Sequence, residues 1–226
     1  MKVTVHQPNY MPYLGIFNKI KNSDIYVMYD VAQYVKDRFD NRNKIRTREG
    51  ELWLTIPVLD KDSLYRRFYE VKLPPKDNWR KKHWKSIETY YCKADYFESY
   101  REDIRRIYDD EYSFLVEINE RIIRFLLREF GITTKIIKTS ELDLDSNLKS
   151  TEMLIGMLKK VDATTYLAGE SGRKYMDESM FSDAHIRLEY QNFTHRTYKQ
   201  VYEPFIPNMA AIDLLFNMGD KSYELI

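Results

Sequence analysis

The stretch His6-Gln7-Pro8-Asn9-Tyr10 places an imidazole, two amides and a phenol within five residues. The imidazole suits a general base, or a donor to a phosphate or a developing oxyanion. The amides and the phenol supply donors and acceptors that orient a ligand. The alternative is a polar turn whose side chains bond their own backbone. Because a buried strand end seldom leaves so many polar groups idle, we predict a functional loop.

A second polar stretch, DVAQYVKDRFDNRN, covers residues 30–43. Asp30 ends a predicted strand, and Gln33 follows it closely. Arg42 is suited to a bidentate clamp on a phosphate or carboxylate, with Asn43 beside it. Mixed-charge runs are also typical of solvated loops. The spacing alone supports both interpretations equally.

Two further stretches carry weaker signals. Gly169-Glu170-Ser171-Gly172 follows a predicted strand and could present backbone N–H groups to an anion, although it matches no Walker A, GxGxxG or GxSxG pattern.

The segment 79–85, WRKKHWK, mixes basic residues with aromatic residues. It fits RNA binding in isolation, but a helix with lysine stems over apolar surface is the preferred interpretation. Lys82 and His83 remain candidate site residues.

His195 and Gln200 occur in a polar segment near the C-terminal end of the sequence. A pair of His6 and His195 could serve acid–base chemistry or a metal. The four histidines lack the spacing of known zinc motifs, so we expect no metal site. The single Cys92 excludes an internal disulfide and a zinc site built from cysteines.

The elements that must position these residues follow from periodicity. Strands are predicted at 3–5, 25–29, 52–58, 135–139, 164–168 and 186–190, and helices at 14–21, 153–158 and 210–217, with a helical stretch over 78–130. The opening strand–loop–helix–strand unit is typical of a parallel sheet. We therefore predict an α/β fold with a mainly parallel sheet of Rossmann-like type. Residues 1–226 are expected to form a single domain with a helical insertion at about 76–130.

In open parallel sheets, ligands bind outside the carboxyl ends of the strands. Three of the polar loops, at residues 6–10, 30–42 and 169–172, follow predicted strands at such ends. This convergence is the main argument for a site.

Composition narrows the class of protein. The net charge of +1 gives no global field for nucleic acid, so no nucleic-acid partner is expected. No stretch approaches the roughly 18 apolar residues of a membrane span, and MKVTVHQPNY lacks the apolar run of a signal peptide. We therefore expect a cytoplasmic protein. The 19 Tyr, 11 Phe and 3 Trp suit half-buried walls around polar ligands, or simply a tyrosine-rich core.

Several blocks together resemble the WbqC-like protein family. They are HQPNYMPYLGIFNKIKNSDIYVMYDVAQY, NRNKI, WLTIPV, WRKKHWKSIETYYCKADYF, YLAGESGRKYM, HRTYKQ and EPFIPNMAAIDLLFNMG, and they span nearly the whole chain. The first block is the most specific. The chain departs from the family pattern at Ala211, where a small hydroxyl residue is expected. A second departure lies at Val31-Ala32-Gln33, where a second acidic residue is more usual after Asp30.

The resemblance implies a bacterial protein of surface-polysaccharide (O-antigen) gene clusters. It implies a transferase that attaches an acyl or aminoacyl group to an amino sugar, with a nucleotide-linked amino sugar as substrate. No cofactor is certain, and ATP or an activated acyl donor is the expected co-substrate. We expect His6 and His195 to be catalytic. The residues expected to bind substrate are Gln7, Asn9, Tyr10, Asp30, Gln33, Arg42, Asn43, Lys82, His83, Gly169, Ser171, Tyr175 and Gln200.

Two other functions remain open from the sequence. One is a non-catalytic ligand-binding module of a glycan-assembly complex. The other is an ATP-dependent, adenylate-forming ligase or a nucleotidylyltransferase-like enzyme, suggested by a strand and a histidine-containing loop before a helix. The second histidine of that superfamily is absent, because Tyr13-Leu14-Gly15 occupies its place. The sequence does not specify the oligomeric state.

Overall fold

The structure is a computed structural model that describes residues 1–59, 66–75, 78–145, 147–174 and 176–226. The chain divides into two compact units. The first comprises residues 1–7, 15–31 and 133–194, and the second comprises residues 8–14, 32–132 and 195–226. The expectation of a single domain over residues 1–226 stays a prediction.

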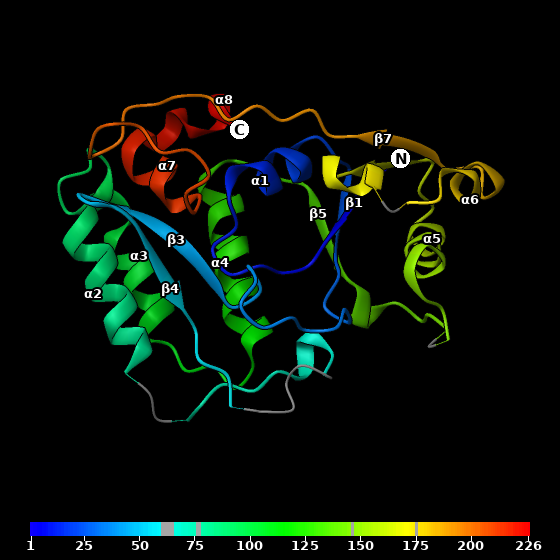
Figure 1. Ribbon diagram of the computed structural model, residues 1–226, viewed down its shortest axis with the longest axis horizontal. Helices are drawn as coiled ribbons and strands as arrows, with labels where there is room; N and C mark the ends of the chain where they lie inside the picture. The colour runs from blue at the N-terminus through cyan, green and yellow to red at the C-terminus, as the bar shows by residue number, and fades with distance from the viewer. Residues whose placement is uncertain (60–65, 76–77, 146, 175) are drawn as a thin grey trace. The chain divides into compact units, whose positions relative to one another are not determined.

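The first unit is built on a five-stranded sheet in the order β5-β2-β1-β6-β7. The strands are β1 (Lys2–His6), β2 (Ile25–Met28), β5 (Lys135–Lys138), β6 (Thr165–Ala168) and β7 (Arg187–Tyr190). Every neighbouring pair is parallel. The predicted α/β fold with a mainly parallel, Rossmann-like sheet is therefore confirmed. The helices of this unit are α1 (Leu14–Lys21), α5 (Ser150–Lys160) and α6 (Glu178–Asp183) (Figure 1).

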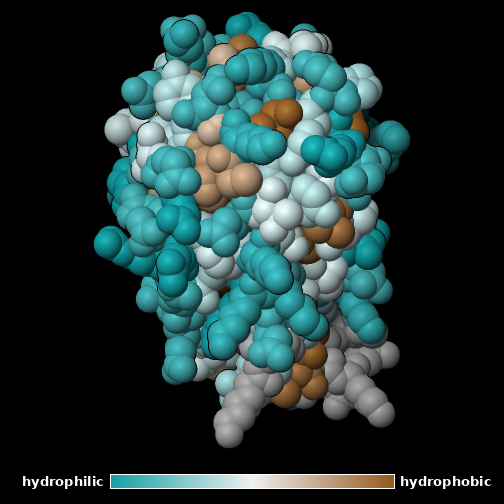
Figure 2. All heavy atoms as spheres, turned by 90° about the vertical axis from the view of Figure 1, so that its left-hand side faces the viewer, coloured by the Kyte–Doolittle hydropathy of each residue, from teal (hydrophilic) through white to brown (hydrophobic). Residues whose placement is uncertain are grey.

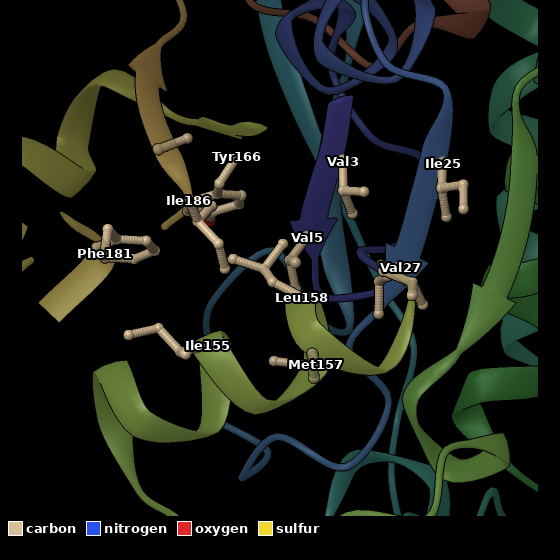
Figure 3. Packing of buried hydrophobic residues seen from close by; sticks show 12 residues of the cluster. Val3, Val5, Ile25, Val27, Ile155, Met157, Leu158, Tyr166, Phe181 and Ile186 are labelled. Carbon is tan, nitrogen blue, oxygen red and sulfur yellow. The ribbon is translucent and has the colours of Figure 1, made fainter. Parts of the chain in front are cut away.

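The hydrophobic core of the first unit lies between the sheet and α5. Side chains at alternate positions of β1 and β2 point to the same face of the sheet. They pack with an apolar stripe of α5 and with residues of β6 and α6, as Figure 3 shows; the cluster includes Val3, Val5, Ile25, Val27, Ile155, Met157, Leu158, Tyr166 and Phe181. By the same alternation, Thr4 and His6 belong to the opposite face. The buried Thr4 hydroxyl donates to the Leu167 carbonyl, so β1 is fixed to β6 by a side chain as well.

The second unit contains a β-hairpin that the sequence did not predict correctly. β3 (Arg42–Thr47) pairs antiparallel with β4 (Gly50–Thr55) in a separate two-stranded sheet. The strand predicted at 52–58 is therefore shifted and lies outside the parallel sheet, and Arg42 and Asn43 begin a strand instead of ending a loop. β3 alternates Arg42, Lys44 and Arg46 with less polar residues, and its first two residues fall within the mixed-charge stretch 30–43, which is equally typical of a solvated loop.

The helical stretch predicted over 78–130 is present as three helices of the second unit. They are α2 (Trp79–Tyr91), α3 (Phe97–Asp109) and α4 (Leu115–Glu129). Each buries one face, as the four-residue spacing of Trp79, His83, Ile87 and Tyr91 on α2 indicates. The chain closes with α7 (Ile212–Met218) and α8 (Ser222–Leu225). Short 3-10 helices occur at Phe68–Glu70, Thr139–Glu141, Glu170–Lys174 and Gly219–Lys221.

One face of the molecule, shown in Figure 2, is mostly hydrophilic, and its hydrophobic residues emerge in separated groups. Soluble folds commonly expose scattered apolar residues of this kind, whereas large continuous patches mark interaction sites. In the described part of the chain, no helix is both long and apolar enough to cross a membrane.

Gly219 offers a sharp test of the packing in the second unit. Its φ of +52° lies in the left-handed region, and a Cβ at this position would collide with the Tyr96 ring. We therefore expect Gly219→Ala to lower the free energy of unfolding by about 2–4 kcal/mol, from backbone strain and overpacking together. Chemical denaturation measures the change.

Gly169 serves as the matched control for this substitution. An added Cβ would meet no atom within 4 Å, and no positive φ is involved. Gly169→Ala should leave the free energy of unfolding within about 0.5 kcal/mol of the wild-type value. Equal effects of the two substitutions would contradict the packing described around Gly219.

Candidate functional site

The topology of the first unit creates a crevice at the carboxyl end of β1. When the five strands are numbered by their order along the chain, they lie across the sheet in the order 3-2-1-4-5. The chain therefore adds strands on one side of β1 up to β5 and on the other side from β6 onward, and the switch point lies between β1 and β6. Parallel α/β sheets bind ligands outside the carboxyl ends of the strands at such a switch point. His6 ends β1, Asp30 follows β2, and Gly169 follows β6. Because these three strands are parallel neighbours, the structure places the three residues along one edge of the sheet.

A cavity of about 480 Å³ opens at this edge, within the first unit. Its walls are mainly aromatic and aliphatic, with a few polar groups. The lining residues are Val5, His6, Gln7, Tyr29, Ser150, Thr151, Leu154, Met157, Tyr166 and Met176. The volume and the mixture of apolar walls with a few polar groups are those of small-molecule sites. His6 and Gln7, predicted from the first loop, thus belong to a cavity wall.

His6 is a neutral imidazole in a defined tautomer. Its Nδ1 lies 2.9 Å from the Gln7 carbonyl oxygen, which can only accept, so Nδ1 carries the proton. Nε2 therefore keeps its lone pair and acts as an acceptor. Burial, together with the nearby Lys19 charge, lowers the pKa of His6 to about 3. Of the two predicted roles, the geometry favours proton acceptor over oxyanion donor.

Lys19 is the residue of this region that sequence reasoning missed. It lies on α1 with 3% of its surface exposed, and its Nζ donates to the Val5 carbonyl oxygen at 3.1 Å. Burial lowers the pKa of Lys19 to about 7. A signal existed in the sequence: Lys19 follows Ile16 by three positions and therefore falls on the apolar stripe of the helix.

Asp30 is engaged within the fold of the first unit. Its side chain is 2% exposed, and its two oxygens accept from the Ser140 backbone N–H at 2.9 Å and from the Ser140 hydroxyl at 2.5 Å. These bonds join the end of β2 to the segment after β5. The predicted role of Asp30 in substrate binding stays a prediction. Both of its carboxylate oxygens already accept hydrogen bonds from Ser140.

The glycine-containing turn after β6 forms a 3-10 helix over Glu170–Lys174. Gly169 precedes it, and Ser171 is exposed on it. Arg173 places its guanidinium 4.0 Å from the centre of the Tyr190 ring, which tethers the turn to β7. Tyr175, also predicted to bind substrate, lies outside the described residues.

The remaining residues of the first loop, 8–10, belong to the second unit, where they form hydrogen bonds with buried side chains of that unit. The Tyr10 hydroxyl lies 2.8 Å from His83 Nδ1 and 2.5 Å from the Tyr108 hydroxyl, and all three residues are buried. Asn43 donates through Nδ2 to the Met11 carbonyl at 2.6 Å, and Asn119 donates to the Pro8 carbonyl at 2.6 Å. Tyr10, Asn43 and His83 therefore hold residues 8–11 in place, while Asn9 stays partly exposed.

A second buried network of this unit surrounds Asp213. Its carboxylate is fully buried and accepts from Tyr91 at 2.8 Å, Tyr198 at 2.7 Å and Gln200 at 2.8 Å. Burial raises the pKa of Asp213, and the three donors oppose that rise. The Tyr91 hydroxyl also accepts from the Arg46 backbone N–H. Gln200, predicted to bind substrate, thus joins α7 to the segment before it.

The other predicted residues of the second unit lie at its surface or in local packing. Arg42 stacks its guanidinium 4.7 Å from the centre of the Trp53 ring. Gln33 and Lys82 are exposed. His195 packs between the rings of Tyr198 and Phe205, and burial lowers its pKa. His6 and His195 belong to different units, so their pairing stays a prediction.

No three His, Cys, Asp or Glu side chains of the described ranges gather closely enough to hold a metal ion. The first unit is that of a Rossmann-like α/β protein, with a cavity at the switch point of its sheet.

Comparison with known proteins identifies the family. The model of the WbqC-like protein family matches residues 7–225, and the chain belongs to that family. A similar protein is "Uncharacterized protein Rv1507c" of Mycobacterium tuberculosis (strain ATCC 25618 / H37Rv). It is 33% identical over 227 residues, which cover 100% of this chain and 97% of that protein. No solved structure matches the chain.

Burial of Lys19 predicts a pH-dependent stability. The folded state binds the proton of Lys19 more weakly than the unfolded chain, whose pKa is near 10.5. The resulting penalty is on the order of 5 kcal/mol, is fully present below about pH 7, and fades as the pH rises toward 10.5. We expect Lys19→Met to raise the free energy of unfolding by about 2 kcal/mol at pH 7, and by much less at pH 10.

Chemical denaturation at several pH values between 7 and 10 checks this expectation. The exposed Lys159→Met is the control in the same unit, and it should stay within about 0.5 kcal/mol of wild type throughout. A Lys19→Met effect that is the same at pH 7 and pH 10 would show that Lys19 is not a buried, weakly protonated amine.

Proposed function

We propose that this protein transfers an acyl or aminoacyl group to the amine of a nucleotide-linked amino sugar in bacterial surface-polysaccharide biosynthesis. The observation that carries the proposal is the cavity at the switch point of the sheet, with His6 and Gln7 in its wall. Its apolar walls suit the acyl chain or a planar group of a donor, and its few polar groups suit orientation of the reacting atoms. The family resemblance supports the polysaccharide context.

His6 supplies the proton acceptor that this reaction needs. The sugar amine attacks the acyl carbonyl carbon, a C–N bond forms, and the bond from that carbon to the leaving group breaks. The proton released from nitrogen passes to Nε2, which the Nδ1–H bond to the Gln7 carbonyl leaves unprotonated. Although the pKa of His6 is low, the ammonium of the tetrahedral intermediate is much more acidic than the ammonium of the free amine, which brings the two pKa values closer together.

One observation favours a second candidate, a non-catalytic ligand-binding module. Several polar residues that the sequence offers for substrate binding are occupied by structural bonds, among them Tyr10, Asp30 and His83. A module of this kind would bind the same ligands in the same cavity without turnover. The two candidates therefore differ in product formation.

The test is a reaction of the purified protein with a UDP-linked amino sugar and either acetyl-coenzyme A or ATP plus an amino acid. Mass spectrometry follows the acylated sugar, and AMP or pyrophosphate release reports adenylate formation. We expect His6→Gln to lower turnover by about 10²-fold, because it removes the proton acceptor while keeping a polar side chain. Stabilisation by a ligand with no product from any donor would favour the binding module.

Leu154→Trp tests the cavity itself. Leu154 is only partly buried and lines the cavity, so an indole has room to fill it without disrupting the core. We expect the variant to keep its fold and to lose at least tenfold in ligand affinity. The control is Leu59→Trp, at an exposed residue of the second unit. If Leu154→Trp binds and turns over substrate like the wild type, the cavity is not the site.

A further inference from the structure

The amine of Lys19 is buried without a negative charge to balance it. An ammonium carries three donors, and the Val5 carbonyl at 3.1 Å accepts one of them. In the part of the chain that the structure describes, no carboxylate lies within ion-pair distance of this amine. Buried cations in proteins are normally paired, because an isolated charge in a low-dielectric interior is costly.

The position of Lys19 shows where the missing charge belongs. The carbonyl that it holds is that of Val5, the residue before His6 at the carboxyl end of β1. Val5, His6 and Gln7 all line the cavity at the switch point. The buried amine therefore bonds the backbone of β1 one residue before the strand end, and its charge acts on His6, which lines the cavity; Lys19 itself is not a lining residue.

The polar groups described around α1 and the end of β1 do not supply that charge. His6 on β1 is a neutral imidazole, and Tyr26 on β2 donates its hydroxyl to the His6 carbonyl at 3.2 Å. Gln191, which follows β7, reaches α1 through neutral bonds to Gly15 and Asn18. A methionine or leucine would pack in the same space without the desolvation cost, so the amine has a use beyond packing.

We propose that the carboxyl end of β1 is a subsite for a phosphate group of the substrate, with Lys19 as its countercharge and His6 beside it. The subsite rests on the proposed function, because it assigns one part of the same ligand. A bound phosphate supplies the negative charge that the described residues do not place beside Lys19. It also draws a proton onto Lys19, because an anion in a desolvated site favours the charged amine.

Sulfate is the probe, because it remains a dianion between pH 6 and pH 8.5 and mimics phosphate, so any pH dependence of its binding belongs to the protein. NMR titrations of the full-length protein give its affinity for sulfate at pH 6 and at pH 8.5. With the pKa of Lys19 at about 7, the protonated fraction falls about thirty-fold between pH 6 and pH 8.5. We expect the wild-type affinity for sulfate to fall by about the same factor.

Two variants separate the charge from the rest of the site. Lys19→Arg keeps its charge at both pH values, so it should bind sulfate with little change between them. Lys19→Met should lose sulfate binding at both, and Lys159→Met should behave like the wild type. If Lys19→Met binds sulfate as the wild type does, the subsite is refuted, even where Lys19→Arg fails to fold.

The two proposals can fail separately. Sulfate binding that depends on Lys19, together with no acylated product, would overturn the transferase and leave the phosphate subsite standing. If acylated product forms but Lys19→Met binds sulfate as tightly as the wild type, the subsite is refuted and the transferase proposal stands.

Discussion

The arrangement of the first unit depends on β1 being a central strand with parallel partners on both sides. β1 pairs with β2 on one side and with β6 on the other. Because the connections leave in opposite directions, no helix is required to cover the carboxyl end of β1, and a crevice forms there. Thr4 secures the strand to β6, and the α5 face of the sheet is closed by a hydrophobic core. The cavity beside His6 is a consequence of this topology and not of any single side chain.

Most of the buried polar residues discussed above bond to one another and stabilise the fold, whereas Lys19 has no such charged partner among the described residues. Asp213 with Tyr91, Tyr198 and Gln200, and Tyr10 with His83, satisfy one another in buried networks. Such networks are stable because every buried polar group has a partner. Lys19 differs from these networks, since its buried amine bonds a carbonyl but meets no carboxylate among the residues that the structure describes. That contrast is the reason for proposing that a charged ligand binds at the end of β1.

The sequence predicted the elements whose pattern is local. The β1–α1–β2 unit and the helical stretch from Trp79 to Glu129 follow from the spacing of apolar residues, and His6 and Gln7 were predicted from their place after a strand. β3 was missed because its charged alternation resembles a loop until β4 pairs with it. Lys19 was missed because lysine is usually solvated, and its burial depends on tertiary packing. The bonds of Tyr10 and Asn43 also connect residues far apart in the chain, which no local pattern reveals.

The central claim is that the cavity at the carboxyl end of β1 binds the substrate. Methyl NMR tests it directly, because Val5, Leu154, Met157 and Met176 line this cavity, whereas Leu59 and Leu73 line a separate cavity in the second unit. The spectra are recorded with a UDP-linked amino sugar, acetyl-coenzyme A and ATP in turn. We predict that at least one of the three shifts the first set of methyl signals and leaves the second set unchanged. Shifts confined to the second set, or no shifts with a ligand that is turned over, would contradict the account.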